Sequence, residues 1–282
     1  MLSRQRARNL VVVVVLAGVG LASGEIRKEY HFSVGRKVNV SIINQYGPIS
    51  VKPGVKGQVS VTAILHSDKV EVDQSQGRKR VDITSHLLSG ADEESGAVEY
   101  IVTAPPDASV NLHSRNGTLH AEGFHGDVTL EGAEAIVDVR DVSDAHVHVR
   151  TLNGPITMTN IREGHVEVTS LSGDVVMSSV NGPFVQVNSN SGKIRYDGEF
   201  GGGGEYFLTS HTGDIEATAP SYASIEVVAR SEQGKVENDF QLQPRHTSFP
   251  IKTGSAFAGT VGKAASSVKL FSISGKIHLK KR

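Results

Sequence analysis

One short pattern repeats along most of this chain and limits its fold more than any other feature. In the copy centred on Gly173, apolar residues lie seven and five positions before the glycine and two and four positions after it, and a serine lies three positions before it. A fixed period of about 20 residues predicts a solenoid, in which each copy forms one coil. Glycine or alanine recurs as the centre at intervals of 18 to 21 residues, at positions 117, 135, 154, 173, 192, 213, 234, 254 and 275.

The apolar positions of the pattern alternate with polar ones and are rich in valine, as in Val166, Val168 and Val175. Period-two alternation of β-branched residues predicts strands with one buried face. Stacked coils would bury these columns only against each other. We therefore predict an all-β fold, a single-stranded parallel β-helix with coils of 18–21 residues. We expect the coils to wind right-handedly, because crossovers between parallel strands are nearly always right-handed.

Two further columns predict how the coils hold their register. Seven of the nine copies carry Ser or Thr three positions before the centre, which predicts a ladder of hydroxyl groups bonded to the turn backbone. The position after the centre alternates in charge over four copies, which would favour one register. Those four residues are Asp174, Lys193, Asp214 and Lys235.

The first 24 residues have the order of a secretory signal. Arg4, Arg6 and Arg8 precede an apolar run over 10–21, and small residues follow at 22–24. A helix of that run spans about 18 Å, which is short of the ~30 Å hydrocarbon core. We expect a cleaved signal over residues 1–24, an exported protein in the periplasm, at the cell surface or outside the cell, and no transmembrane domain after cleavage. An uncleaved membrane anchor is the alternative.

The mature chain divides by the regularity of its pattern. Residues 25–107 follow it loosely and are expected to form an N-terminal cap with irregular first coils, while residues 108–282 form the regular solenoid. A separate small β-sandwich is the alternative for the first part. The chain has no cysteine, so disulfides and thiolate metal sites are excluded. Its net charge of −1 comes from interspersed charges, which argues against nucleic acid as a partner.

These features together resemble one bacterial family. They are the signal, the segment Ala104–Leu112 with its two prolines, and the iterated Ser-x-Ser-Gly-x-Val turn. Over roughly residues 38–280 the chain resembles the putative adhesin family with the β-strand-repeat domain of unknown function 4097. That resemblance implies an exported, envelope-associated β-solenoid without an assigned enzymatic activity.

One group of outward residues suggests a metal site. His146 and His148 alternate with inward valines, and His165 and Glu167 occupy the same positions 19 residues later. In a parallel stack the four would form a two-by-two surface patch. Imidazole and carboxylate groups suit Zn²⁺ or Cu²⁺, so we hypothesise a surface metal site there. Solvated outward side chains without a ligand are the alternative.

The acidic run with Asp138, Asp141 and Asp144 raises the possibility of a carbohydrate-active enzyme, because some parallel β-helices carry catalytic acids on an outer sheet. General acid–base catalysis needs a second carboxylate at a fixed distance. The rung neighbours expected for Asp138 are His120 and Thr157. We therefore expect turn capping, no catalytic residues and no cofactor.

Binding fits the remaining features better than catalysis. The alternation would place some of Val176, Val185 or Gln186, Phe200 and Phe257 outside, on a flat adhesive face. The chain ends at Lys280–Arg282, directly after the last copy, so an uncapped coil could pair end to end with another protomer. We predict a non-enzymatic putative adhesin or structural component of the envelope, with envelope polysaccharide, the cell surface or another protein as partner. The alternatives are the carbohydrate-active enzyme and a metal-binding, stress-sensing periplasmic module.

Overall fold

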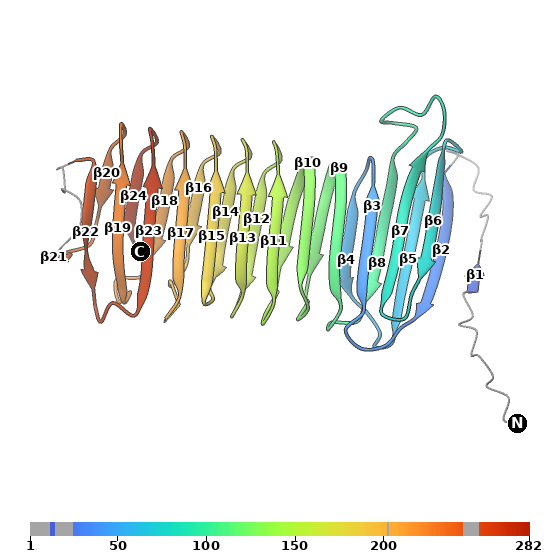
Figure 1. The fold of residues 1–282 in the computed structure, drawn as a ribbon, viewed down its shortest axis with the longest axis horizontal. Coiled ribbons are helices and arrows are strands. Elements are labelled where there is room, and N and C mark those ends of the chain that lie inside the picture. The colour runs from blue at the N-terminus through green and yellow to red at the C-terminus, as the bar shows by residue number, and fades with distance from the viewer. Residues whose placement is uncertain (1–11, 15–24, 202, 245–253) are drawn as a thin grey trace, which may run out of the picture.

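The computed structural model describes residues 12–14, 25–201, 203–244 and 254–282, and in them the chain forms a long stack of β-strands (Figure 1). Every regular element of these residues is a strand, and most strand pairs are parallel, which confirms the predicted all-β, repeat-built fold. A search of the same residues for a helix able to cross a membrane finds none.

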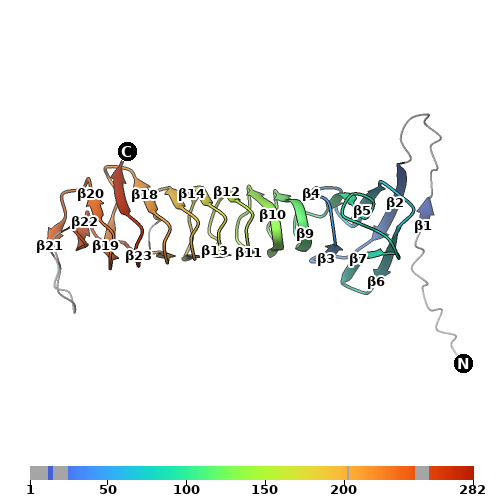
Figure 2. The same cartoon turned by 90° about the horizontal axis from the view of Figure 1, so that it is seen from above.

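Each coil contributes one strand to a front sheet, which faces the viewer in Figure 1, and one to a back sheet; Figure 2 shows the two layers from above. Two long strands bend from the front sheet into the back sheet, β9 (Ser109–Glu122) and β10 (Val128–Arg140). The other front strands of the coils are β3 (Asn39–Asn44), β11 (His146–Thr151), β13 (His165–Ser170), β15 (Phe184–Ser189), β17 (Glu205–Ser210), β19 (Ile225–Ser231) and β23 (Ser266–Ser272). The back strands are β4 (Ile49–Pro53), β12 (Ile156–Ile161), β14 (Val175–Val180), β16 (Ile194–Asp197), β18 (Ile215–Ala219), β20 (Val236–Asn238) and β24 (Ile277–Lys281).

The apolar columns of the repeat fill the space between the two sheets. Val166 of β13 lies in register with Val147 of β11 and Val185 of β15, and all three side chains are buried. The columns after the centre behave in the same way on the back sheet, where Met158 pairs with Met177. Each coil therefore buries its apolar residues against the coils on either side, as the period predicts.

The hydroxyl column forms the expected ladder along the upper turns. Ser170 Oγ donates to the carbonyl oxygen of Gly173 over 2.8 Å, and Ser189 Oγ donates to that of Gly192 over 2.9 Å. Ser210 Oγ instead accepts from the backbone N–H of Gly213 at 2.9 Å. These hydroxyls are buried, so each satisfies a turn group that water cannot reach.

The coils do not stack in the order of the sequence, which corrects the expected simple succession. The last coil, β23 and β24, lies between the coil of β17 and β18 and the coil of β19 and β20, with parallel pairing on both sides. The predicted charge order changes accordingly, because Asp214 accepts from the backbone N–H of Lys276 at 2.7 Å where Lys235 was expected. Since every coil has the same apolar columns, the pattern could not show which coils are neighbours.

The repeat centred on Gly254 is not a coil. Its later half belongs to β22 (Ala256–Val261), which runs antiparallel to β19, and β21 (Gln243–Pro244) pairs with β22 at the outer edge. The expected members of its first half, Thr247, Phe249 and Ile251, lie outside the described residues. The last coil of the sequence is therefore internal, with β24 between β18 and β20, and antiparallel β22 and β21 follow β19 at the end of the front sheet.

The N-terminal end is closed by strands that are mostly antiparallel. They are β2 (Ile26–Ser33), β5 (Gln58–Leu65), β6 (Val70–Gln76), β7 (Arg80–Leu87) and β8 (Val98–Ala104), and β1 (Val12–Val14) pairs with β2. The coil of β3 and β4 pairs with β9 on one side and with β7 and β8 on the other. Both sheets thus continue into residues 25–107, where they end in antiparallel pairs.

Two residues expected at an adhesive face belong to the core. Val185 is fully buried, and Phe200 is 2% exposed. The ring of Phe200 stacks on Tyr196 at 4.4 Å between centroids and meets Tyr206 edge-on at 5.0 Å. Phe200 lies in the turn between β16 and β17, which is longer than the turn between β14 and β15, and its ring packs on these two tyrosines.

Candidate functional site

The four residues hypothesised to bind metal lie together on the outside of the front sheet. His146 of β11 pairs in register with His165 of β13, and His148 pairs with Glu167. Glu167 contacts two imidazoles, His165 Nε2 at 3.2 Å and His148 Nδ1 at 3.5 Å. The parallel register therefore produces the two-by-two patch that the 19-residue spacing predicts.

The four side chains do not converge on a common point. Glu167 pairs with His165 and His148, whereas His146 Nδ1 pairs with Asp127 Oδ1 at 3.3 Å, outside the patch. The side chain of His146 is 72% exposed, so water competes for both ring nitrogens. Among the residues that the structure describes, no group of three or more His, Asp or Glu side chains is arranged to hold a metal ion. The metal site stays a hypothesis that this geometry does not support.

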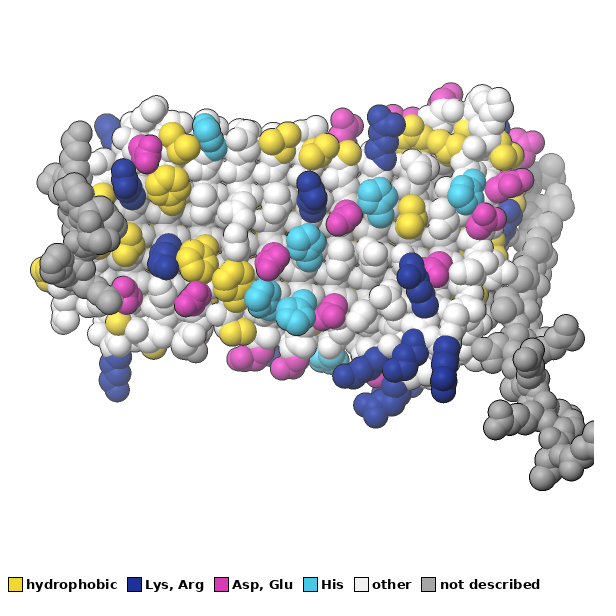
Figure 3. Space-filling model, viewed as in Figure 1, with side chains coloured by type: hydrophobic (Ala, Val, Ile, Leu, Met, Phe, Trp, Pro, Cys, Tyr) yellow, Lys and Arg dark blue, Asp and Glu magenta, His cyan; other side chains and the backbone are white. Residues whose placement is uncertain are grey.

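The patch continues along the front sheet as a row of rings. His146 meets His165 edge-on at 5.1 Å between centroids, and His165 stacks on Phe184 at 4.6 Å. Phe184 contacts Phe207 at 5.7 Å, and Lys269 Nζ lies 4.7 Å from the centre of the Phe207 ring. We call these five residues the aromatic row; Figure 3 shows it crossing the middle of the front face.

The aromatic row offers both apolar and charged contacts to a partner. Its rings lie one coil apart and shield part of each other's faces, so they present edges and partial faces to solvent, with Glu167 and Glu205 beside them. Lys269 is held over Phe207 by a cation–π contact. The result is a flat strip with apolar, acidic and basic groups, which suits an extended partner lying across several coils.

Comparison with known protein families identifies the family to which this fold belongs. The family model described as Toastrack DUF4097 matches residues 38–280. The chain belongs to this family. The expected resemblance to the family of domain of unknown function 4097 is therefore confirmed.

Two solved structures are similar to this Toastrack chain. A putative cell adhesion protein from Clostridium sporogenes is 12% identical, with a TM-score of 0.29, and the match covers 91% of this chain and 100% of the other. A putative adhesin from Bacteroides fragilis is 9% identical, with a TM-score of 0.43, and the match covers 93% of this chain and 98% of the other. The search of curated proteins finds no match.

Of the three acidic residues considered for catalysis, Asp138 lies on the back sheet of the Toastrack chain, in β10. His120 lies between two carboxylates, with Nδ1 2.9 Å from Asp138 and Nε2 3.1 Å from Glu122. Arg140 is 2.9 Å from Asp138, and Lys52 is 3.1 Å from Glu122. The hydrogen bond from Lys52 and the one from His120 lower the pKa of Glu122. A general acid needs a raised pKa, so Glu122 is in the wrong environment to donate a proton.

This network shows what sequence reasoning missed. The repeat predicted that Asp138 lies beside His120 of the adjacent coil. It did not predict that Glu122, two residues after His120 in β9, contacts the same imidazole. Asp141 and Asp144 adopt φ values of 53° and 54° in the lower turn. Asp141 also accepts a hydrogen bond from the side chain of Asn160 in the adjacent coil, and capping of the turn through backbone N–H groups stays a prediction.

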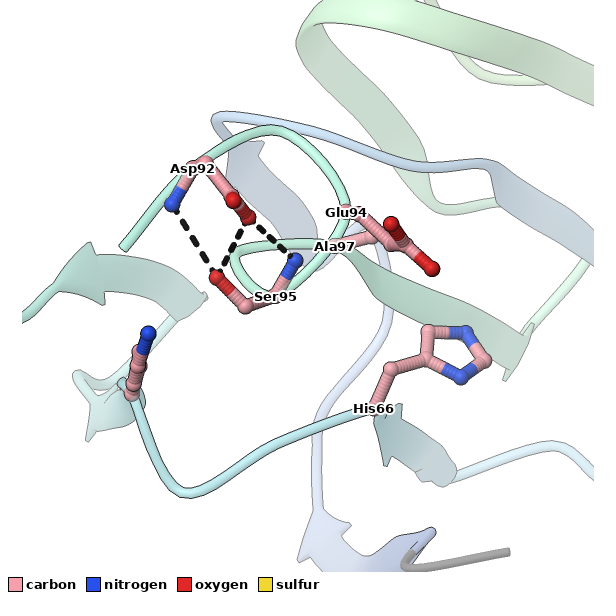
Figure 4. A pocket seen from close by; sticks show the side chains of 6 residues that line it. His66, Asp92, Glu94, Ser95 and Ala97 are labelled. Carbon is pink, nitrogen blue, oxygen red and sulfur yellow. Dashed lines mark hydrogen bonds between the residues drawn. The ribbon is translucent and has the colours of Figure 1, made fainter. Parts of the chain in front are cut away.

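An open depression lies by the loop that connects β7 and β8 (Figure 4). Its volume is about 490 Å³, and its lining residues are His66, Lys69, Asp92, Glu94, Ser95 and Ala97. Asp92 and Ser95 bond each other, with Asp92 Oδ1 accepting from the Ser95 backbone N–H at 2.8 Å and from its hydroxyl at 2.5 Å. These bonds, the hydroxyl one first, lower the pKa of Asp92. The polar groups thus close the loop on itself.

Proposed function

We propose that this Toastrack protein is exported and non-enzymatic, and that it binds an extended partner as an adhesin or as a structural, polymer-binding component of the bacterial envelope. The partner class is envelope polysaccharide, a cell surface or another protein. On this proposal the binding surface is the front sheet. We also expect its coils to wind right-handedly, as parallel β crossovers nearly always do.

The aromatic row is the observation that carries this proposal. Rings on four strands, β11, β13, β15 and β17, follow one another on the outside of a sheet whose inner face is fully packed. Half-exposed rings of this kind serve as anchors in binding surfaces, because their burial gives large contact area at low entropy cost. The rigid stack fixes their spacing before any partner arrives, which lowers the cost of binding.

The experiment is a binding assay on residues 25–282. The purified chain is incubated with isolated peptidoglycan, outer-membrane polysaccharide and whole cells, and light scattering after size exclusion gives its oligomeric state. The test variant is Phe184→Ser with Phe207→Ser, which removes two rings of the row. The matched control is Val176→Ser, which changes a half-buried outward residue of the back sheet.

We expect saturable retention on one of these materials and a loss of affinity of roughly tenfold or more in the double variant, the range for aromatic anchors. The control should bind as the unmodified chain does. Equal retention of both variants would exclude the aromatic row as the binding surface. No retention on any material, together with concentration-dependent growth into rods, would replace the binding proposal by self-assembly.

A further inference from the structure

Three lower turns of the N-terminal end bring positive charges together. They follow β2, β4 and β6 and meet at one edge of the molecule. The backbone N–H of Val34 donates to the carbonyl of Gly57 over 2.9 Å, and that of Asn39 donates to Lys79 over 2.9 Å. Figure 3 shows the dark blue side chains gathered below this end. We call their five cations the basic edge: Arg36, Lys37, Lys56, Arg78 and Lys79.

The charge of the basic edge is largely uncompensated. All five side chains are exposed. Arg36 is 92% exposed and lies 3.7 Å from the carboxylate of Asp107. The other four cations make no ion pair with another described residue. Two cations near the basic edge are neutralised by carboxylates. Arg80 pairs with Asp82 of the same strand, and Lys52 of β4 pairs with Glu122 of the adjacent strand β9. Four net positive charges therefore face solvent at this edge.

An apolar side chain stands among these cations. Val55, at the tip of the turn after β4, is 71% exposed, more than any other described valine, leucine or isoleucine, and Lys56 follows it directly. A depression of about 670 Å³ lies behind this turn, lined by apolar Val34, Pro105 and Pro106 and by the cations Arg36 and Lys56. His125 also lines it.

This combination favours a lipid surface over a dissolved polyanion. Lysine and arginine are attracted to anionic headgroups, and the attraction falls off within a Debye length. An exposed valine gains from entering the interface between headgroups and acyl chains but gains nothing from a hydrated polyanion. A row of turns on the outside of a solenoid also meets a plane more readily than it encloses a strand of polymer.

The charges farther along the same edge decide the orientation. The lower turns of the following coils carry Asp127, Asp144 and Glu163, which an anionic surface repels. Arg162 and Lys263 are single exposed cations farther along this edge, so its positive charge is concentrated at the N-terminal end, and we expect the long axis of the solenoid to tilt away from the surface.

We propose that the basic edge docks on the anionic headgroups of a phospholipid membrane, with Val55 entering the interface. This surface is separate from the aromatic row and lies on a different side of the molecule. Docking at this end would leave the aromatic row, which begins on β11 several coils away, free to bind a partner.

The test uses the full chain and sedimentation with phosphatidylglycerol-containing vesicles, compared with vesicles of phosphatidylcholine alone. The first variant replaces Lys37, Lys56, Arg78 and Lys79 by Gln. Its matched control removes the same charge elsewhere through Arg150→Gln, Lys235→Gln, Lys263→Gln and Lys281→Gln, so the N-terminal residues contribute equally to both. A second variant, Val55→Ser, removes the apolar anchor. Unchanged circular dichroism and thermal unfolding verify that each variant is folded.

We expect the basic-edge variant to partition onto anionic vesicles at least about tenfold less than the control, since each cation near such a surface contributes on the order of 1 kcal/mol. Val55→Ser should reduce partitioning about threefold, and this difference should persist at high salt, because it is apolar in origin. Equal partitioning of the basic-edge variant and its control overturns the proposal. It is also overturned if Val55→Ser has no effect and inorganic polyphosphate competes fully, because the edge is then a polyanion site.

Discussion

The stacked upper turns leave no room for a side chain at the glycine centres of the repeat, and Gly173→Ala tests this. A Cβ built on Gly173 would lie 1.9 Å from the carbonyl oxygen of Gly154, 2.5 Å from its carbonyl carbon and 3.2 Å from the nitrogen of Pro155. All three are backbone atoms of the adjacent coil. The substitution therefore cannot be absorbed by a rotamer change.

The size of the effect follows from that overlap. Ordinary van der Waals contact begins at 3.4 Å, so the carbonyl oxygen is 1.5 Å too close and the two turns must separate. The turns on both sides are stacked in the same way, since Gly192 would place its Cβ 2.0 Å from the oxygen of Gly173. Overpacking of this kind costs typically 1–3 kcal/mol, and we expect about 3 kcal/mol because backbone has to move.

The assay is unfolding in urea and by heat. For a chain of this size each kcal/mol corresponds to roughly 2–4 °C, so Gly173→Ala should unfold about 6–12 °C lower. Gly77→Ala is the matched control, because its Cβ would meet its first neighbour at 3.8 Å, an ordinary contact. We expect the control to change stability by less than about 1 kcal/mol, in the stabilising direction, through the unfolded chain. Should both variants unfold together with the unmodified protein, the close contact of the turns is not a constraint on the fold.

Two further changes test the hydroxyl ladder and a cluster of ion pairs around Glu216 on the back sheet. Ser170→Ala removes a buried hydroxyl that donates to Gly173 O over 2.8 Å and should cost about 1–2 kcal/mol in urea unfolding, whereas the exposed Ser172→Ala should stay within about 0.5 kcal/mol; equal effects would deny the ladder a role. The hydrogen bond from Lys280, together with the charges of Lys280, Lys193 and Arg195, lowers the pKa of Glu216 in the folded chain. The ionised Glu216 therefore stabilises the fold above the pKa that this carboxyl has in the unfolded chain, and this stabilisation is lost as pH falls through its pKa in the folded chain. Glu216→Gln should therefore be less stable than the unmodified chain at neutral pH and equal to it once the carboxyl is protonated, and a pH-independent difference in urea unfolding would contradict this assignment.

The candidate site was predicted in part from residue spacing. The 19-residue interval correctly placed His146 beside His165 and His148 beside Glu167, because parallel strands in register bring equivalent positions together. The extension of this patch through Phe184, Phe207 and Lys269 was missed. Those residues occupy outward positions of later coils, and Lys269 becomes the neighbour of Phe207 only because β23 lies against β17. The basic edge was missed for a related reason, since its three turns are far apart along the chain.

The sequence by itself determined the repeating unit of this protein: strands that alternate apolar and polar residues, a hydroxyl before most of the upper turns, and glycine at the centre of all copies but the one at Ala135. These are local consequences of period and of side-chain size, and they hold whichever coil lies next. The tertiary structure alone decided the order of the coils, because Val268, Leu270 and Ile277 satisfy the same columns as the residues of any other coil. Identical units can stack in several orders with similar burial, so the choice rests on contacts that no single repeat contains. Here the last coil pairs with β17 on one side and β19 on the other, and antiparallel β22 ends the front sheet beyond them.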